Sequence, residues 1–221
     1  MDKLKSTFKN MFLSLLIICL VVAVILAQVY KLTAGPIEEA RAKKLESAIT
    51  EVVPEFDNNP VDDAYKMPTS GGDSLLIYPA LKNNEVVGFA VNTNSNNGFS
   101  GAIEIMVGFD TNSKVINYAV LSHAETPGLG SKMGEWFKDV NKEKQSIIGR
   151  DLSKGILKVA NDGGEIDAIT ASTITSRAFL EAVNKAYAAY KDSDAYAGAT
   201  KANDDNINEE INEEKGEEGN E

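Results

Sequence analysis

Hydroxylated and small side chains gather in one short segment near the C-terminal end of the chain, just ahead of an alanine-rich helical pattern. The segment reads Asp167-Ala-Ile-Thr-Ala-Ser-Thr-Ile-Thr-Ser-Arg177. Helix N-termini present unpaired backbone N–H groups and a partial positive charge, so they attract phosphate. A forked guanidinium (Arg177) and hydroxyl donors would strengthen such a site. The hydroxyl donors are Thr170, Ser172, Thr173 and Thr175. The alternative is ordinary helix capping, which the local spacing by itself favours.

A second segment with possible chemistry lies upstream and reads His123-Ala-Glu-Thr-Pro-Gly-Leu-Gly-Ser-Lys132. Its proline fixes φ, and its two glycines permit unusual dihedrals and leave bare backbone. A rigid loop with exposed N–H groups and one apolar side chain suits a flat, hydrogen-bonding ring. The alternative is a plain Gly/Pro turn between a strand and a helix. The residues expected to contact such a ring are Glu125, Thr126, Gly128, Leu129 and Gly130.

Both segments resemble the FMN-binding domain family. The first is similar to the family's flavinylation motif, Asp-x-x-Ser/Thr-Gly-Ala-Thr, and the second to its His-x-Glu-Thr-Pro-Gly-Leu-Gly loop. A third segment, Gly98-Phe-Ser-Gly-Ala-Ile103, resembles one that opens a strand in this family. The resemblance covers residues 36–190 and the membrane segment. It is strongest to the G subunit of the Rnf electron-transport complex, with the C subunit of the sodium-pumping NADH:quinone reductase as the close alternative.

The resemblance implies a cofactor and its attachment. In this family the last threonine of the motif carries FMN through a phosphoester bond, which corresponds to Thr173. Asp167 matches the motif's acid and Thr170 its first hydroxyl residue. Ala171 stands where the family has glycine and Ser172 where it usually has alanine, which argues against a positive φ at position 171. The resemblance therefore implies that FMN is bound by Thr173, Asp167, Thr170, Ser172, Thr175 and Ser176 together with the 125–130 loop.

Other chemistry is not expected. His123 is the only histidine and Cys19, within an apolar run, is the only cysteine, so neither a metal site nor an iron–sulfur cluster is predicted. No general base stands next to Thr173 in the sequence, and the family uses a separate flavin transferase that takes FMN from FAD. We therefore expect no independent catalytic activity. Three residues after the loop, Met133, Trp136 and Phe137, have helical spacing and are predicted to pack in the core.

Residues Phe12 to Tyr30 form an apolar run that three residues interrupt, namely Ser14, Cys19 and Gln28. At about 1.5 Å per residue, this run is as long as a bilayer's hydrocarbon core is thick. A cleaved signal peptide is the rival interpretation, but the run is long for one and lacks a good cleavage site. We expect a retained, single-pass anchor.

The charges around this anchor do not decide its orientation, because lysines and arginines flank both ends. The family resemblance implies a bacterial inner (plasma) membrane protein whose flavin domain lies on the periplasmic, extracytoplasmic side. Of the net charge of −11, the last 21 residues contribute −7. Such an acidic segment argues against nucleic-acid binding.

Five parts are expected along the chain. They are a cytoplasmic N-terminus (1–11), a transmembrane helix (12–31), a juxtamembrane helix (32–56) opened by Pro36, an FMN-binding domain (57–192) and an acidic disordered tail (193–221). Within the domain we predict a loop at 57–73, helices at 132–150 and 173–190, and strands at 75–81, 86–91, 102–109, 115–121 and 155–160. Asn83-Asn84 and residues 110–113 supply turn chemistry for antiparallel hairpins. The predicted fold class is α+β.

The predicted function is that of an electron carrier with covalent FMN in an ion-translocating redox complex of the Rnf type. Its partners would be the other membrane subunits, the lipid bilayer and, during maturation, the flavin transferase. One alternative is the C subunit of the quinone reductase. The other is a membrane-anchored scaffold domain that has lost the flavin, an idea motivated by Ala171 and Ser172.

Overall fold

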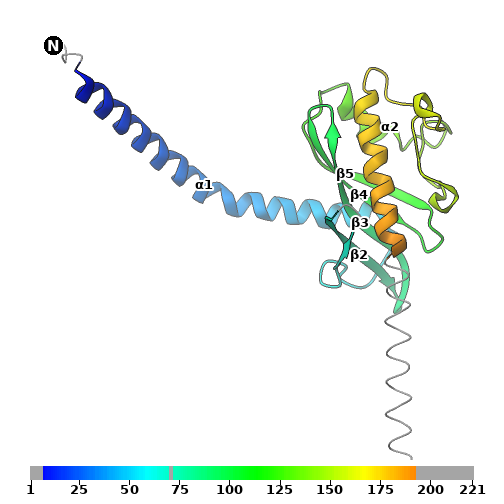
Figure 1. Cartoon of the computed structure of the whole chain (residues 1–221). Helices are drawn as coiled ribbons and strands as arrows, with labels where there is room; N and C mark the ends of the chain where they lie inside the picture. The colour runs from blue at the N-terminus through cyan, green and yellow to red at the C-terminus, as the bar shows by residue number, and fades with distance from the viewer. Residues whose placement is uncertain (1–6, 70–71, 193–221) are drawn as a thin grey trace, which may run out of the picture. The chain divides into compact units, whose positions relative to one another are not determined.

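The computed structural model describes residues 7–69 and 72–192 (Figure 1). The chain forms two compact units, the first ending at Leu45 and the second beginning at Glu46. The predicted acidic tail and most of the predicted cytoplasmic N-terminus lie outside the described residues.

The first unit is helical and belongs to α1 (Phe8–Val52). By length and composition α1 can cross a membrane, and its apolar side chains from Phe8 to Leu32 are exposed. An apolar helix is therefore confirmed near the N-terminus. Pro36 lies inside α1 rather than at the start of a second helix. A proline removes one backbone hydrogen bond from a helix interior. The helix nevertheless continues through Pro36, because the loss is small beside the hydrogen bonds of its 45 residues.

The second unit contains a five-stranded sheet in which every neighbouring pair is antiparallel and consecutive in the chain. The predicted α+β class and hairpins are confirmed. Asn83 and Asn84 join the second and third strands with φ of 53° and 64°, values that two-residue hairpin turns require and that asparagine tolerates. The strands are β1 (Tyr65–Pro68), β2 (Ser74–Lys82), β3 (Glu85–Gly98), β4 (Gly101–Phe109) and β5 (Val115–His123).

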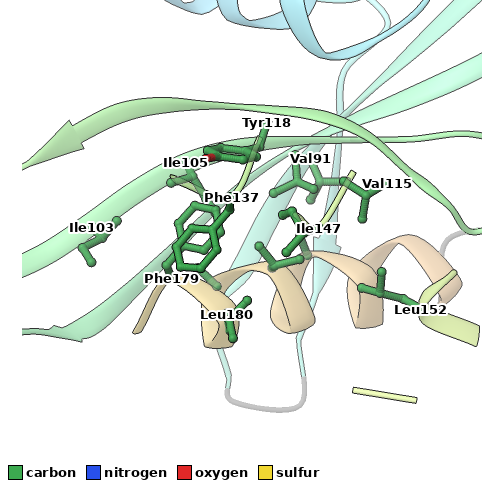
Figure 2. Close-up of a cluster of buried hydrophobic side chains, with 14 of the residues drawn as sticks. Val91, Ile103, Ile105, Val115, Tyr118, Phe137, Ile147, Leu152, Phe179 and Leu180 are labelled. Atoms are coloured by element: carbon green, nitrogen blue, oxygen red, sulfur yellow. The ribbon is translucent and has the colours of Figure 1, made fainter. Parts of the chain in front are cut away.

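One face of the sheet packs against a helix of residues 173–192, drawn yellow to orange in Figure 1. Phe179 of this helix stacks on Phe137, with ring centroids 4.5 Å apart, and meets the edge of Tyr118 at 4.8 Å. Figure 2 shows these rings within a cluster of aliphatic side chains from the strands, the helix and the segments that connect them. The predicted core positions of Met133 and Phe137 are confirmed, since both are fully buried.

The other face receives the last turns of α1 within the second unit. Residues alternate across a strand, so Gly108 faces away from Val107 and Phe109 of the main core. A Cβ at Gly108 would collide with the backbone of Val52. Ala48, Ile49 and Val52 are buried, so the end of α1 belongs to the fold of this unit.

Three further predictions of secondary structure are wrong. The predicted loop at 57–73 contains β1, a four-residue edge strand whose single buried residue gives no clear alternation. The predicted helix at 132–150 is limited to η1 (Gly130–Lys132) and α2 (Met133–Trp136). Beyond α2, the Asp139 carboxylate accepts the backbone N–H of Asn141 at 3.1 Å, a side-chain bond that competes with helix formation.

The predicted strand at 155–160 is irregular chain between η2 (Leu152–Lys154) and η3 (Ala160–Asp162). The side-chain amide of Asn184 takes both backbone groups of Leu157, accepting its N–H at 2.9 Å and donating to its carbonyl at 2.8 Å. A neighbouring strand would need the same two backbone groups. Because Asn184 of the 173–192 helix occupies them, the segment does not form a strand at Leu157. The predicted final helix is confirmed as residues 173–192.

Candidate functional site

A pocket of about 360 Å³ lies where three segments of the chain meet. They are the turn between β3 and β4, the 125–130 loop, and the hydroxyl turn, by which we mean residues 169–176. The two segments singled out in the sequence are thus brought together, although some forty residues separate them. The lining residues are Phe99, Glu125, Thr126, Leu129, Gly130, Ala171, Ser172, Thr173, Ile174 and Thr175.

The hydroxyl turn is stabilised by its own last serine. The Ser176 hydroxyl accepts the N–H of Ile169 at 2.9 Å and donates to the carbonyl of Ser172 at 3.0 Å. The Ser176 N–H donates to the same carbonyl and begins the helical bonding pattern. The N–H groups of residues 173–175 precede that bond and have no carbonyl four residues back within the helix. The pocket therefore borders a helix N-terminus with open donors.

Ala171 has a φ of 60°, so the expectation that this position does not need a positive φ is wrong. The physical reason lies on either side of it, because the turn must bury both Ile169 and Ser172. The chain adopts the left-handed conformation that glycine would favour, at a cost of about 1–2 kcal/mol for a residue with a Cβ. The alanine preserves the geometry expected of a glycine.

The five hydroxyl side chains of this turn have different environments. Thr175 and Ser176 are buried and hydrogen-bonded, Ser172 is buried, and Thr170 is exposed but does not line the pocket. Thr173 lines the pocket and is half-buried. Among the described residues, no partner is found for its hydroxyl. Thr173 is therefore the most exposed of the hydroxyl residues of this turn that line the pocket.

The 125–130 loop bonds largely to itself. The carbonyl of Thr126 accepts the N–H groups of Leu129 and Ser131, and the Gly128 N–H donates to the Ser131 hydroxyl at 2.9 Å. Gly128 has a φ of 75°, which confirms the expected unusual dihedral. Gly128 does not line the pocket, whereas the other four loop residues named from the sequence do.

Glu125, which the sequence predicts to contact the ring, lines the pocket and has both carboxylate oxygens directed to hydrogen-bond donors of the protein. Its side chain is buried, with 5% of its surface exposed. One carboxylate oxygen, Oε1, accepts the N–H of Ser100 at 3.0 Å, and the other, Oε2, accepts the Thr175 hydroxyl at 2.7 Å. Both oxygens are thus used inside the protein.

Three apolar side chains at the pocket remain exposed to solvent. Phe99 is 67% exposed, Ile174 48% and Leu129 41%. Leu129 was predicted from the sequence, whereas Phe99 and Ile174 were not. Exposed apolar side chains grouped around one pocket are typical of a ligand site. The resemblance of residues 98–103 was the signal that could have pointed to Phe99.

Arg177 does not face the site in the way the sequence suggested. Its guanidinium forms a two-pronged ion pair with Asp162, with Nε–Oδ2 and Nη2–Oδ1 distances of 2.7 Å each. The guanidinium lowers the pKa of the Asp162 carboxyl, and that carboxyl raises the pKa of Arg177. Asp167 also lies outside the pocket lining, and its backbone carbonyl accepts the indole N–H of Trp136 at 3.0 Å.

Metal chemistry finds no support in the described part of the chain, where no cluster of three or more His, Cys, Asp or Glu side chains could hold a metal ion. His123 is exposed, and its Nδ1 accepts the N–H of Glu125 at 3.1 Å. This bond fixes the start of the loop, which is a structural role.

These features fit a flavin nucleotide. The open N–H groups suit a phosphate, and the three apolar side chains suit the faces of an isoalloxazine ring. Residues 98–188 match the family described as the FMN-binding domain.

Relatives extend the match beyond this domain. The G subunit of an ion-translocating oxidoreductase complex from Vibrio vulnificus is 34% identical over 171 residues, which cover 72% of this chain and 78% of the relative. The G subunit of the Na(+)-translocating ferredoxin:NAD(+) oxidoreductase complex from Acetobacterium woodii is 31% identical over 201 residues, which cover 86% of this chain and 96% of the relative. A further G subunit, from Aliivibrio fischeri, is 30% identical over 197 residues, 84% and 91%. The chain belongs to the family of G subunits of Rnf-type ion-translocating oxidoreductase complexes, as the resemblance implied.

Proposed function

We propose that this chain is the electron-carrying subunit of a membrane-bound, ion-translocating redox complex and that FMN is esterified to Thr173. Family membership and the FMN-binding domain support the cofactor and the kind of complex. The long apolar helix supports a membrane protein.

The observation that carries the attachment site is the state of the hydroxyls in the hydroxyl turn. Thr173 lines the pocket without being buried, whereas Ser172 and Thr175 line it from buried positions. A phosphoester at Thr173 would leave the buried Thr175–Glu125 bond intact.

Each part of the pocket then has a task. The N–H groups of residues 173–175 hold the phosphate, and Phe99, Leu129 and Ile174 contact the ring. Bound FMN supplies the electron-transfer chemistry, and the protein supplies attachment, orientation and electrostatics. The tether keeps the cofactor at a position where the partner proteins of the complex can reach it.

Attachment needs a second enzyme. A threonine hydroxyl is a weak nucleophile that requires a base, and the titratable side chain in the pocket lining, Glu125, is already bound to Thr175 and Ser100. A flavin transferase would remove the hydroxyl proton while the threonine oxygen attacks the FMN phosphorus of FAD. The pyrophosphate P–O bond breaks, and AMP leaves.

The orientation in the membrane belongs to the same proposal. The domain lies on the periplasmic, extracytoplasmic side of a bacterial plasma membrane, with lipid and the other subunits of the complex as its partners. An alkaline phosphatase fusion after residue 192 is expected to be active, because this enzyme works only outside the cytoplasm. An inactive phosphatase fusion, together with an active fusion of a cytoplasmic reporter at the same position, would contradict this orientation.

Replacing Thr173 by Ala tests the attachment. The full chain is produced with its transferase, and flavin fluorescence is read on a denaturing gel. Thr173→Ala is expected to abolish the fluorescent band. The matched control Thr170→Ala removes an exposed hydroxyl outside the pocket lining and is expected to keep it. A band that persists in Thr173→Ala contradicts the assignment, and intact mass identifies the bound group.

The flavin-free scaffold alternative predicts a colourless protein even when the transferase is present. It was motivated by Ala171, and that residue keeps the left-handed turn of a glycine. The visible spectrum of the purified chain decides between the two, because bound flavin absorbs in the visible range.

A further inference from the structure

The Glu125 carboxylate lies at the junction of the three segments that form the pocket. We propose that Glu125 is a positioning residue, whose carboxylate joins the β3–β4 turn, the 125–130 loop and the first turn of the 173–192 helix so that Thr173 faces the pocket. The inference rests on the proposed attachment of FMN at Thr173.

The hydrogen bonds give the first argument. Oε1 takes the Ser100 N–H from the β3–β4 turn, and Oε2 takes the Thr175 hydroxyl from the helix. Thr175 is two residues from Thr173, in the same helical turn. A bond that holds Thr175 therefore fixes the direction of that turn, while the Thr173 hydroxyl stays open. Hydrogen bonds to a charged group are stronger than those between neutral groups.

Two glycines give the second argument, which is independent of the bonds. A Cβ at Gly130 would lie 2.5 Å from Oε2 of Glu125 and 2.8 Å from the Thr175 hydroxyl. A Cβ at Gly98 would collide first with the carbonyl oxygen of Gly101 and would also lie 2.8 Å from Oε1 of Glu125. Real Cβ atoms do not approach so closely, so the Glu125–Thr175 pair excludes a side chain at Gly130, whereas at Gly98 the carboxylate adds to an exclusion that the backbone of Gly101 already imposes.

Charge gives the third argument. Among the residues that the structure describes, no lysine or arginine forms an ion pair with Glu125, although its side chain is 5% exposed. A buried carboxylate is costly unless hydrogen-bonded. A leucine or methionine would fill such a place more cheaply if packing were its task. The acid is explained by the need to hold specific donors from two other segments.

The test measures how fast the full chain, purified in detergent without flavin, is labelled by transferase and FAD. Glu125→Ala and Thr175→Val are expected to slow labelling about tenfold or more, because the acceptor turn loses its fixed geometry. Glu125→Gln and Thr175→Ser are expected to stay within about threefold of the wild type, since a glutamine can accept from Ser100 and donate to Thr175.

Asn184→Ala is the matched control. Asn184 also joins a distant segment to the same helix by two hydrogen bonds, but on the Leu157 side, away from the pocket lining. It is expected to lower the melting temperature and to be labelled at the wild-type rate. This separates positioning from a general loss of stability.

Wild-type labelling of folded Glu125→Ala, or equal slowing of Asn184→Ala, would overturn the inference and leave the attachment at Thr173 standing. If Glu125→Ala does not fold, the pair Thr175→Val and Thr175→Ser decides in the same way. A wild-type chain that takes up no flavin at Thr173 would instead overturn the proposed function, and the inference with it.

Discussion

The two ends of the 173–192 helix are built for different purposes. Its first turn carries hydroxyls, adjoins the left-handed Ala171 and borders a pocket with exposed apolar side chains. Its last turns are packed by rings: Tyr190 stacks on Phe109, with centroids 5.2 Å apart, and tilts against Phe89 at 5.3 Å. One helix can thus be anchored firmly at one end while the other end stays strained and accessible.

The largest effect is expected at the packed end. Tyr190→Ala removes a ring that is 1% exposed and should lower the free energy of unfolding by about 3–5 kcal/mol. Urea denaturation of the detergent-solubilised chain measures this. Tyr190→Phe keeps the ring and loses one hydrogen bond to the Asp110 carbonyl, a change of about 1 kcal/mol. Loss of covalent flavin from the folded fraction of Tyr190→Ala would show that the two ends are not independent.

An electrostatic effect is expected only at the pocket end. Glu125→Gln removes a buried negative charge that opposes electron uptake by a group in the pocket, so the flavin midpoint potential should become more positive. At an effective dielectric constant near 20, a unit charge about 8 Å away contributes ~2 kcal/mol, equivalent to some tens of millivolts. Redox titration with spectroscopic detection measures the shift.

The control for this shift is Lys185→Gln, which also changes the charge by one unit. Lys185 lies in the second half of the same helix, 3.2 Å from an Asp73 carboxylate oxygen, and its variant should leave the potential nearly unchanged. Shifts of equal size and opposite sign in the two variants would mean that the potential follows net charge and not the pocket, because Glu125→Gln removes a negative charge and Lys185→Gln a positive one.

The backbone strain before Thr173 should be measurable. Ala171→Gly relieves the left-handed conformation and is expected to raise the free energy of unfolding by up to about 1 kcal/mol. Ala171→Val, with a β-branched side chain at positive φ, should lower it by roughly 1–2 kcal/mol. Thermal denaturation of both variants gives the order. A stable Ala171→Val would show that the turn is not strained.

The smallest effect is expected from the exposed ion pair beside the hydroxyl turn. Arg177 lowers the pKa of the Asp162 carboxyl. The contribution of the pair is therefore present above the ordinary carboxyl pKa of about 3.9 and is lost as pH falls through the lowered value in the folded state. Asp162→Asn should be slightly less stable than the wild type at pH 7, and the difference should vanish on acidification. A difference that grows at low pH would contradict this.

Much of this fold could be predicted because local signals agree with the tertiary structure. Asn83-Asn84 specifies its turn, and four strands can be recognised as short apolar runs between turn residues. The sequence failed where a distant side chain decides. The Asn184 side chain, 27 residues away in the sequence, forms hydrogen bonds with both backbone groups of Leu157, and no local sequence pattern predicts such a contact.

The site divides in the same way. The hydroxyl turn and the 125–130 loop could be predicted from residue types and motif resemblance. The left-handed Ala171 could not, because burial of its neighbours imposes the conformation. Phe99 and Ile174 were also missed, since an apolar residue at a pocket rim and one in a core are alike in sequence.

The burial of Ala48, Ile49 and Val52 against the sheet has a practical consequence for fragments of this protein. A soluble version cut at the apparent end of the helical region, near residue 57, would expose the strand face around Gly108. Retaining the chain from Glu46 onward keeps that face covered. The apolar part of α1 can be removed for crystallisation or voltammetry only upstream of those turns.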